Sequence, residues 1–194
     1  MGACLFMEYK TLQLSDGLNE YLQSCRTRLS ERTIKVYSGY LKRMTKHFGE
    51  HTLLKDISVT CIEEFINLQA QKHGYKESTR MNLINALKAF FLWHKALGNT
   101  DIPIELVRGP KIPERFPAFL SPEQFEWVQD YYNSNNYLEL QRLLVFSMLF
   151  DTGMRIGELL ALNLSDINST ECYTSITTEK TKKLRLVMWS DTTH

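Results

Sequence analysis

Two residues that could bind a phosphate lie in the segment LLVFSMLFDTGMRIGELLALNLSDI, residues 143–167. Arg155 begins the second apolar stretch of this segment, and Glu158 follows three residues later. This spacing is that of an ordinary helical ion pair, worth about 0.2–0.5 kcal/mol, and composition alone favours that interpretation. However, we expect Arg155 at a helix N-terminus, where the backbone attracts anions. Its apolar neighbours predict a partly desolvated guanidinium, which is suited to bidentate phosphate recognition.

A second candidate site is a set of cations on the helix predicted after Ser30. Four cations and a glycine fall on one stripe of this helix, and they could hold a DNA or RNA backbone, because glycine permits close approach. A solvated helix face rich in lysine explains the same pattern equally well. The stripe consists of Arg32, Lys35, Gly39, Lys42 and Lys46.

A weaker set of candidates lies on the polar side of the helix predicted after Ser78, and near its start. These residues are Lys76, Arg80, Asn85 and Lys88. Surface lysines are common and need no special explanation, so this set supports nucleic-acid binding less strongly than the stripe does.

Three lysines crowd the tip of a β-hairpin predicted near the C-terminus: Lys180, Lys182 and Lys183. A lysine at such a tip could enter a minor groove or donate a proton to a leaving group. For Lys182 and Lys183, a solvent-facing turn is the favoured interpretation.

Metal and cofactor chemistry finds little support in the sequence. His47 and His51 have the spacing of metal ligands, but Gly49 interrupts the helix between them and no third ligand is near. P-loop, G-x-S-x-G and G-x-G-x-x-G motifs are absent. We therefore expect neither a metal nor a cofactor.

Hydrophobic periodicity predicts a helical domain over residues 10–97. Apolar positions recur at helical spacing in four segments, and the helix after Ser30 shows a clean alternation of three and four residues. The predicted N-terminal caps of the four helices are Ser15, Ser30, Thr60 (in a capping box with Glu63) and Ser78.

Residues 98–117 hold four of the five prolines and show no helical period, which predicts an extended interdomain linker. Residues 118–194 form the second predicted domain. It begins with a helix capped by Ser121 and Gln124, followed by a buried helix from Tyr137 to Phe150 and a short helix from about Arg155 to Ala161. The segments ECYTSIT and LRLVMW then predict two strands joined by TEKTKK.

Composition places the chain among soluble globular proteins, with 43% hydrophobic and 23% charged residues. No apolar run is long enough to span a bilayer, and no signal peptide is recognised. The net charge of +1 hides a difference between residues 1–110, at +4, and residues 111–194, at −3. The cysteines are far apart and predict free thiols in a reducing cytoplasm: Cys4, Cys25, Cys61 and Cys172.

Together these segments resemble the tyrosine recombinase (phage integrase) family over nearly the whole chain. The segments LSERTIKVYSGYLKRMTKHFG and ESTRMNLINALKAFFLWHKALG resemble helices of its N-terminal core-binding domain, and FPAFLSPEQFEWV resembles the entry to its catalytic domain. The most specific match is LFDTGMRIGELLALNLSDIN, which resembles the family's first-arginine box. TEKTKKLRLVMW resembles the hairpin that carries the active-site lysine, although Met188-Trp189 replaces the usual Pro-Leu.

The resemblance implies a mainly α-helical protein: a four-helix, SAM-like core-binding domain, a proline-rich linker, and the first part of an α+β catalytic domain with a β-hairpin. It implies DNA integration and recombination, in which a tyrosine attacks the scissile phosphodiester and leaves a 3′-phosphotyrosyl link without a metal. Arg155 would bind non-bridging phosphate oxygens, Glu158 would orient it, and Lys180, with Lys182 as an alternative in register, would protonate the 5′-hydroxyl. The domains would clamp duplex DNA from two sides, alongside other protomers in the cytoplasm.

The chain departs from the family at its end. In the family a His-x-x-Arg motif, a further His or Trp and the nucleophile follow the hairpin, and none of Tyr131, Tyr132, Tyr137 or Tyr173 lies where the nucleophile belongs. We therefore expect a fragment or truncated product that cannot cleave DNA alone. The alternatives are a non-catalytic duplex-binding module, accessory to or competing with an intact recombinase, and a helical protein-interaction domain.

Overall fold

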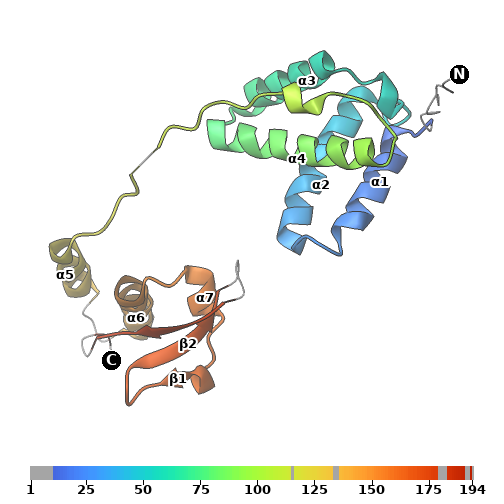
Figure 1. Cartoon of the computed structure of the whole chain (residues 1–194). Coiled ribbons are helices and arrows are strands. Elements are labelled where there is room, and N and C mark those ends of the chain that lie inside the picture. Colours follow the sequence, from blue (N-terminus) through green and yellow to red (C-terminus); the bar gives the residue numbers. More distant parts are fainter. Residues whose placement is uncertain (1–10, 115, 133–135, 179–182, 191–192, 194) are drawn as a thin grey trace, which may run out of the picture. The chain divides into compact units, whose positions relative to one another are not determined.

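The four amphipathic segments predicted in the first half of the chain fold as helices. The computed structural model describes residues 11–114, 116–132, 136–178, 183–190 and 193 (Figure 1). Contacts divide the chain into two units, Met1–Arg115 and Phe116–His194. The helices of the first unit are α1 (Leu14–Cys25), α2 (Glu31–Phe48), α3 (Val59–His73) and α4 (Glu77–Ala96), with short 3-10 helices η1 (Leu54–Asp56) and η2 (Ile104–Leu106).

The predicted start of α2 is confirmed, whereas those of three other helices are wrong. The Ser30 side chain accepts a hydrogen bond from the Thr33 backbone N–H at 3.3 Å. By contrast, Ser15, Thr60 and Ser78 lie inside their helices, which are capped at Gln13, Ser58 and Lys76. At α1 the reason is tertiary: backbone carbonyls of the loop at residues 50–52 accept from the first N–H groups of the helix.

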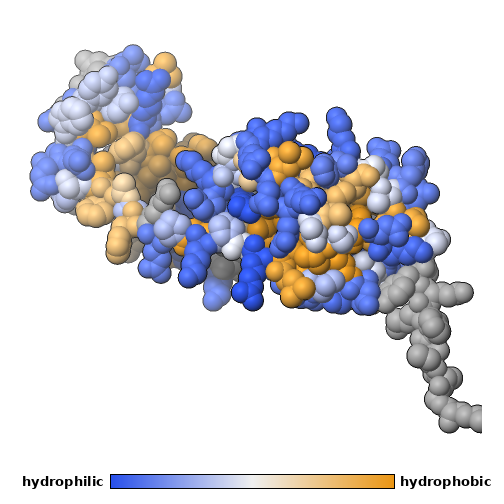
Figure 2. All heavy atoms as spheres, turned by 90° about the horizontal axis from the view of Figure 1, so that it is seen from above, coloured by the Kyte–Doolittle hydropathy of each residue, from blue (hydrophilic) through white to orange (hydrophobic). Residues whose placement is uncertain are grey.

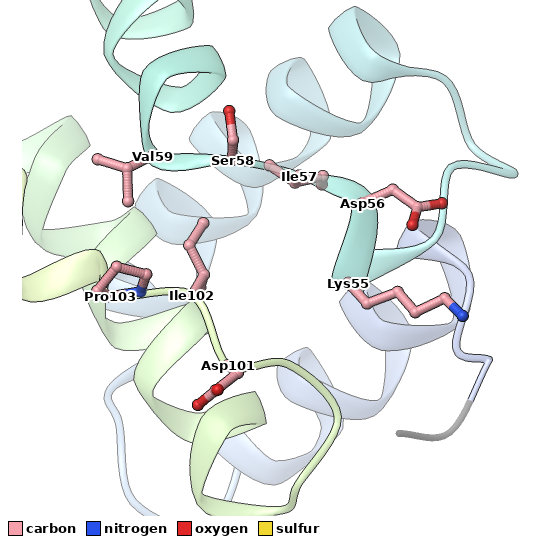
Figure 3. Close-up of a pocket in the computed structure, with 8 residues that line it drawn as sticks. All are labelled: Lys55, Asp56, Ile57, Ser58, Val59, Asp101, Ile102 and Pro103. Atoms are coloured by element: carbon pink, nitrogen blue, oxygen red, sulfur yellow. The ribbon is translucent and has the colours of Figure 1, made fainter. Parts of the chain in front are cut away.

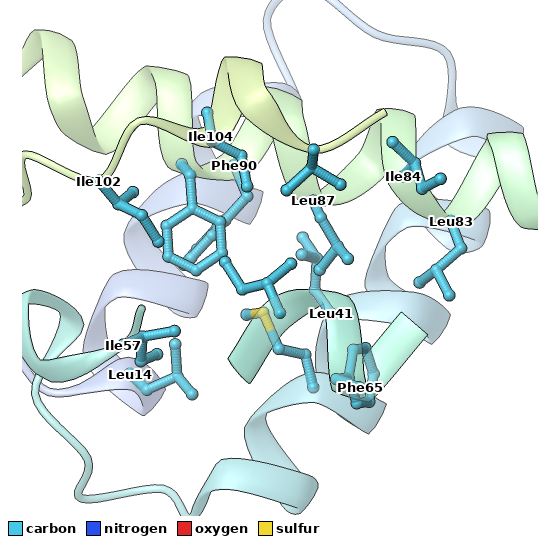
Figure 4. Packing of buried hydrophobic residues seen from close by; sticks show 14 of the residues in the cluster. Leu14, Leu41, Ile57, Phe65, Leu83, Ile84, Leu87, Phe90, Ile102 and Ile104 are labelled. Atoms are coloured by element: carbon cyan, nitrogen blue, oxygen red, sulfur yellow. The ribbon is translucent and has the colours of Figure 1, made fainter. Parts of the chain in front are cut away.

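The core of the first unit lies between these helices (Figure 4). The apolar period of α2 buries Leu41 and Met44, which pack with Phe65 of α3 and with Phe90 and other residues of α4. Each of these four side chains is completely buried. Burial of one such side chain contributes about 1.5–3 kcal/mol, so this core fixes the rotation of α2 about its axis.

The segment predicted as a linker contributes to this core over its first half. Ile102, Ile104 and Val107 are 6%, 0% and 2% exposed and belong to the same cluster of buried residues (Figure 4). Gly109 also lies against α4, because a Cβ atom there would stand 2.4 Å from the Met81 methyl group. The extended, exposed part of the segment therefore begins only after Pro110.

A buried polar group joins α1 to α4. Nε2 of His94, which is fully buried, lies 3.1 Å from the Gly17 carbonyl oxygen, and its Nδ1 lies 3.0 Å from the side-chain amide nitrogen of Asn99. Both ring nitrogens are satisfied when a neutral imidazole donates through Nε2 and accepts through Nδ1. Burial lowers the pKa of His94 from 6.5 to about 4. A Cβ atom at Gly17 would lie 2.9 Å from Leu54 Cδ1 and 3.2 Å from this ring, so a side chain there would force its neighbours to shift.

The second unit pairs helices with a small antiparallel sheet. Its helices are α5 (Pro122–Tyr131), α6 (Tyr137–Thr152), α7 (Ile156–Leu160) and the 3-10 helix η3 (Leu164–Asp166). The sheet order is β1-β2-β3, with strands β1 (Ile167–Asn168), β2 (Tyr173–Thr177) and β3 (Leu184–Met188). The predicted hairpin is confirmed, with Tyr173 opposite Met188 and Thr177 opposite Leu184. The capping box of Ser121 and Gln124 is also present.

The helix predicted as buried is mostly exposed. Among its described residues only Ser147 and Met148 are buried, while Tyr137, Leu144 and Phe150 are 76%, 52% and 40% exposed. The core cluster of this unit is small and consists of Met148, Met154, Ile176 and Val187. Apolar side chains are visible at the surface in the face that Figure 2 shows. None of the helices described is both long and apolar enough to cross a membrane.

The His94 environment predicts that acid destabilises the first unit. The unfolded chain takes up a proton near pH 6.5, whereas folded His94 does so only near pH 4. The unfolded state therefore binds more protons between these values, so stability is full above about pH 6.5 and falls by about 3 kcal/mol as the pH drops to 4. Hydrogen exchange of the α4 amides, corrected for intrinsic rates, measures this loss. The His94→Gln variant should lack it, and an unchanged pH dependence in that variant would exclude His94 as its source.

The packing of η2 gives a second prediction, with a matched control two residues away. Ile104→Ala should lower the free energy of unfolding of the first unit by about 2–5 kcal/mol, because it removes a fully buried side chain. Leu106→Ala, in the same 3-10 helix but 64% exposed, should change it by about 0.5 kcal/mol or less. Urea denaturation of both variants measures the difference. Equal effects would show that this segment is not part of the core.

Candidate functional site

Arg155 and Glu158 form the ion pair that their spacing predicts. Arg155 is the N-cap residue of α7, and its backbone N–H donates to Glu158 Oε2 at 2.8 Å. Its Nη1 donates to Glu158 Oε1 at 2.9 Å. Glu158 thus binds both the backbone and the guanidinium of the same residue, which restricts the arginine to one orientation at the start of the helix.

Within this pair the glutamate is buried and the arginine is exposed, which is the reverse of the prediction. The Glu158 side chain is 3% exposed, whereas the Arg155 side chain is 63% exposed. The predicted desolvated pocket around Arg155 is therefore wrong for this structure. Of the two apolar residues that flank Arg155, Met154 is buried in the core and Ile156 is 50% exposed, and they do not enclose the guanidinium.

A second arginine, which the sequence analysis did not identify, completes this cluster. Arg185 Nη2 lies 3.3 Å from Glu158 Oε2, so two guanidinium groups share one carboxylate. The backbone hydrogen bond from Arg155 is the main cause that lowers the pKa of Glu158, with the charges of both arginines adding to it. The carboxylate is ionised at neutral pH, and the cluster keeps one positive charge in excess. Alternation along β3 was the available signal, because Arg185 shares a face with buried Val187.

Of the three lysines predicted at the hairpin tip, one lies within the residues that the structure describes. Lys180 and Lys182 lie outside the described residues. Lys183 is exposed and lies just before β3. Its backbone exchanges hydrogen bonds with Thr178, the residue that follows β2.

The cationic stripe of α2 lies on the surface, opposite the core. Arg32, Lys35, Lys42 and Lys46 are all exposed, whereas Leu41 faces the interior. A Cβ atom built at Gly39 would meet nothing within 4 Å, so the middle of the stripe is open to a ligand. Within the part of the chain that the structure describes, no carboxylate pairs with these four cations. Their charge is therefore available for an anionic ligand.

The predicted residues on and near α4 are not part of this stripe. Arg80 is half-buried and donates through Nη2 to Asn67 Oδ1 of α3 at 2.6 Å. Lys88 is half-buried and close enough to Glu105 for its charge to lower the pKa of that carboxyl, after a backbone hydrogen bond and the contact with Lys95. Lys76 is exposed and caps α4. Arg80 is thus engaged by α3 through one hydrogen bond, and a DNA contact of these residues stays a prediction.

A further cation of the stripe, Arg43, was missed by the sequence analysis. It follows Gly39 by four residues, one turn along the same face, and this spacing was the signal that could have found it. Arg43 lines a pocket with Lys35 and Gly39 from α2 and with His73 and Tyr75 from the α3–α4 connection. Lys42 and Lys46 line a separate pocket against α1.

Another pocket lies away from all the predicted site residues. It forms where η1 and the start of α3 meet residues 101–103, and Figure 3 shows its lining. Lys55, Asp56 and Asp101 bring mixed charges to it. Neither here nor elsewhere in the described ranges do three or more His, Cys, Asp or Glu residues gather in a way that could hold a metal ion.

Comparisons with known proteins agree with this arrangement. Residues 14–97 match the family described as phage integrase, N-terminal SAM-like domain. A tyrosine recombinase of Pseudothermotoga lettingae is 31% identical over 178 residues, which are 90% of this chain and 60% of the relative. The tyrosine recombinase XerD of Yersinia pestis is 33% identical over 144 residues, covering 72% of this chain and 47% of the relative. The chain thus spans 47% to 60% of the length of these relatives.

Solved structures show the same fold. A lambda integrase dimer bound to a COC′ core site superimposes with a TM-score of 0.73 at 20% identity, covering 91% of this chain and 62% of that one. XerH site-specific recombinase bound to its difH substrate gives a TM-score of 0.63 at 22% identity, covering 92% and 53%. The helical unit with its SAM-like match, the first-arginine segment before a β-hairpin, and these relatives together support the assignment of the chain to the tyrosine recombinase (phage integrase) family.

Proposed function

We propose that this chain is the duplex-DNA-binding region and the first part of the catalytic domain of a tyrosine-type site-specific recombinase. The observation that carries the proposal is the exposed, unpaired cationic face of α2, centred on an open glycine. Lysine and arginine side chains that neutralise phosphates release bound counterions from DNA, which drives binding without regard to sequence. The relatives named above are recombinases and integrases, and the solved ones are bound to DNA.

Arg155 is the proposed ligand of the scissile phosphate. Its guanidinium is exposed, yet it is oriented by a carboxylate that is itself buried, so it can bind non-bridging oxygens without a large loss of side-chain freedom. The excess positive charge shared with Arg185 stabilises the negative charge that builds up on the non-bridging phosphate oxygens during attack. Glu158 is a positioning residue in this proposal, because it acts through Arg155.

The proposed reaction is strand transfer through a protein–DNA ester. The oxygen of a tyrosine attacks the phosphorus, the bond to the 5′-oxygen breaks, and a 3′-phosphotyrosyl link forms. Lys180 is the proposed donor of the proton that the departing 5′-oxygen takes up. In this proposal the protein works in the cytoplasm, on the nucleoid, with further recombinase protomers beside it on the DNA.

Charge reversal on α2 tests duplex binding. Lys35→Glu and Lys42→Glu should each weaken binding to duplex DNA and reduce the slope of log K against log salt by about 1 or more, because each removes a phosphate contact and adds a repulsive charge. Lys55→Glu is the matched control, since Lys55 is exposed but lies on η1 beside Asp56. Fluorescence anisotropy across a salt series measures both quantities. Binding that is equal in all three variants would favour a helical protein-interaction domain instead.

Arg155 can be tested in the same assay. Arg155→Ala should lower the salt slope by about 1 through the loss of one phosphate contact. Arg142→Ala removes an exposed arginine of α6 in the same unit, so it should leave the slope unchanged. A slope that falls equally in both variants would show a general charge effect and would count against Arg155 as a specific phosphate ligand.

A further inference from the structure

Aromatic and cationic side chains meet on one flank of α2, where Arg43 extends the stripe that carries the proposed DNA contacts. Arg43 and Tyr40 come from α2, and Tyr75 and His73 come from the end of α3 and the turn that follows it. This group has no part in the core chemistry of Arg155, which belongs to the other unit. Its arrangement is specific enough to ask what Arg43 recognises.

Arg43 is held in place by two tyrosines. Its Nη1 donates a hydrogen bond to the Tyr75 hydroxyl, and its Cζ lies 6.0 Å from the centre of the Tyr40 ring. Tyr75 is fixed in turn, because its ring meets Tyr40 edge-to-face at 6.5 Å and stacks on the His73 ring at 5.5 Å. The guanidinium is thus oriented before any ligand arrives. Less rotamer freedom is therefore lost when this arginine binds a ligand.

The partners of Arg43 are neutral, and this distinguishes it from a structural ion-pair residue. Among the described residues no carboxylate is within ion-pair distance of Arg43. Its charge is therefore not cancelled, and only one of its N–H groups is known to be engaged by protein. Arg43 is itself exposed, and a guanidinium carries several N–H donors, so further donors remain for a ligand.

The neighbours of Arg43 along α2 form a line that could enter a groove. Arg32, Val36, Gly39 and Arg43 follow one another by four, three and four residues, so they lie along one ridge of the helix. Val36 is 45% exposed, and Gly39 leaves open space beside it. An apolar side chain, a glycine and a fixed arginine in line suit contact with base edges in a major groove: a thymine methyl for the first and guanine O6 and N7 for the last.

The lysines of the stripe lie beside this line of residues, and Lys35 lines the same pocket as Arg43. Lys35, Lys42 and Lys46 are spaced by seven and four residues and follow a neighbouring ridge of the helix. Flexible ammonium groups suit phosphates, which carry charge but no sequence information, whereas a fixed bidentate fork suits a particular base. The two ridges therefore divide the work of affinity and specificity.

We propose that Arg43, oriented by Tyr40 and Tyr75, is the specificity-determining residue of α2 and donates to O6 and N7 of one guanine in the major groove of duplex DNA. This inference rests on the proposed function, because it presupposes that α2 binds duplex DNA. It adds the chemical identity of the base that is read and the residues that prepare the reader.

Selection from a library of randomised duplexes tests the proposal with the whole chain and without knowledge of the natural target. The wild-type chain should enrich a motif with one strongly preferred G·C pair. Arg43→Lys keeps the charge but loses the fork, so the preference for guanine at that position should fall by about 5- to 150-fold while other positions are retained. Tyr75→Phe removes only the orienting hydrogen bond and should reduce the same preference less. Lys42→Ala is the control and should weaken binding to all sequences with the motif unchanged.

A base analogue confirms the contact atom. Placing 7-deazaguanine, which lacks the N7 acceptor, at the selected position should weaken binding of the wild-type chain but not of Arg43→Lys. A motif that survives intact in Arg43→Lys, or duplex binding without any sequence preference in the wild type, would overturn the inference and leave the proposed function standing. Failure of the wild-type chain to bind any duplex would overturn both. Circular dichroism checks that the variants remain folded.

Discussion

The second unit depends on one buried carboxylate. The Glu158 side chain is 3% exposed, and a carboxylate with so little contact with water stays ionised only when cations and hydrogen bonds compensate its charge. Arg155 compensates it from within the same turn and Arg185 from a strand that lies 27 residues further along the chain. The start of α7 is thereby joined to β3, and the exposed guanidinium is directed by a group that solvent does not reach. One charge is left in excess at this point, and an anion is its natural complement.

The first unit also directs its cationic side chains toward solvent, but it does so through the burial of apolar residues. Leu41 and Met44 fix the rotation of α2, so that its cationic face must point away from the core. Residues 102–107 close that core from outside the four helices, and His94 joins α1 to α4 with every ring nitrogen satisfied. A surface that binds a long, regular ligand such as a duplex needs a rigid helix behind it, and this packing supplies it.

Sequence patterns predicted what is local and missed what is not. The period of α2 is a property of eighteen consecutive residues, so its core face and its stripe could be read directly. The Arg185–Glu158 contact joins distant segments, and alternation on β3 shows only that Arg185 faces inward, not what it meets. Proline content marked residues 98–117 as irregular but could not show that Ile104 enters a core. The start of α1 was missed because a loop carbonyl, that of Thr52, replaces a side-chain cap.

Arg155 and Arg43 differ in what holds them, and this difference separates their proposed tasks. Arg155 is held by the Glu158 carboxylate, which on its own would cancel the charge of the arginine. Because Arg185 shares this carboxylate, the cluster keeps a net positive charge. Such a cluster is suited to a ligand that gains negative charge during reaction. Arg43 is held by neutral rings and a hydroxyl, so its donors are directed without being neutralised. Hydrogen-bond donors held in one direction can distinguish one base from another. A concentrated positive charge instead binds the transition state of phosphoryl transfer more strongly than the ground state. In these proposals an arginine serves recognition in one unit and chemistry in the other, according to the partner that orients its guanidinium.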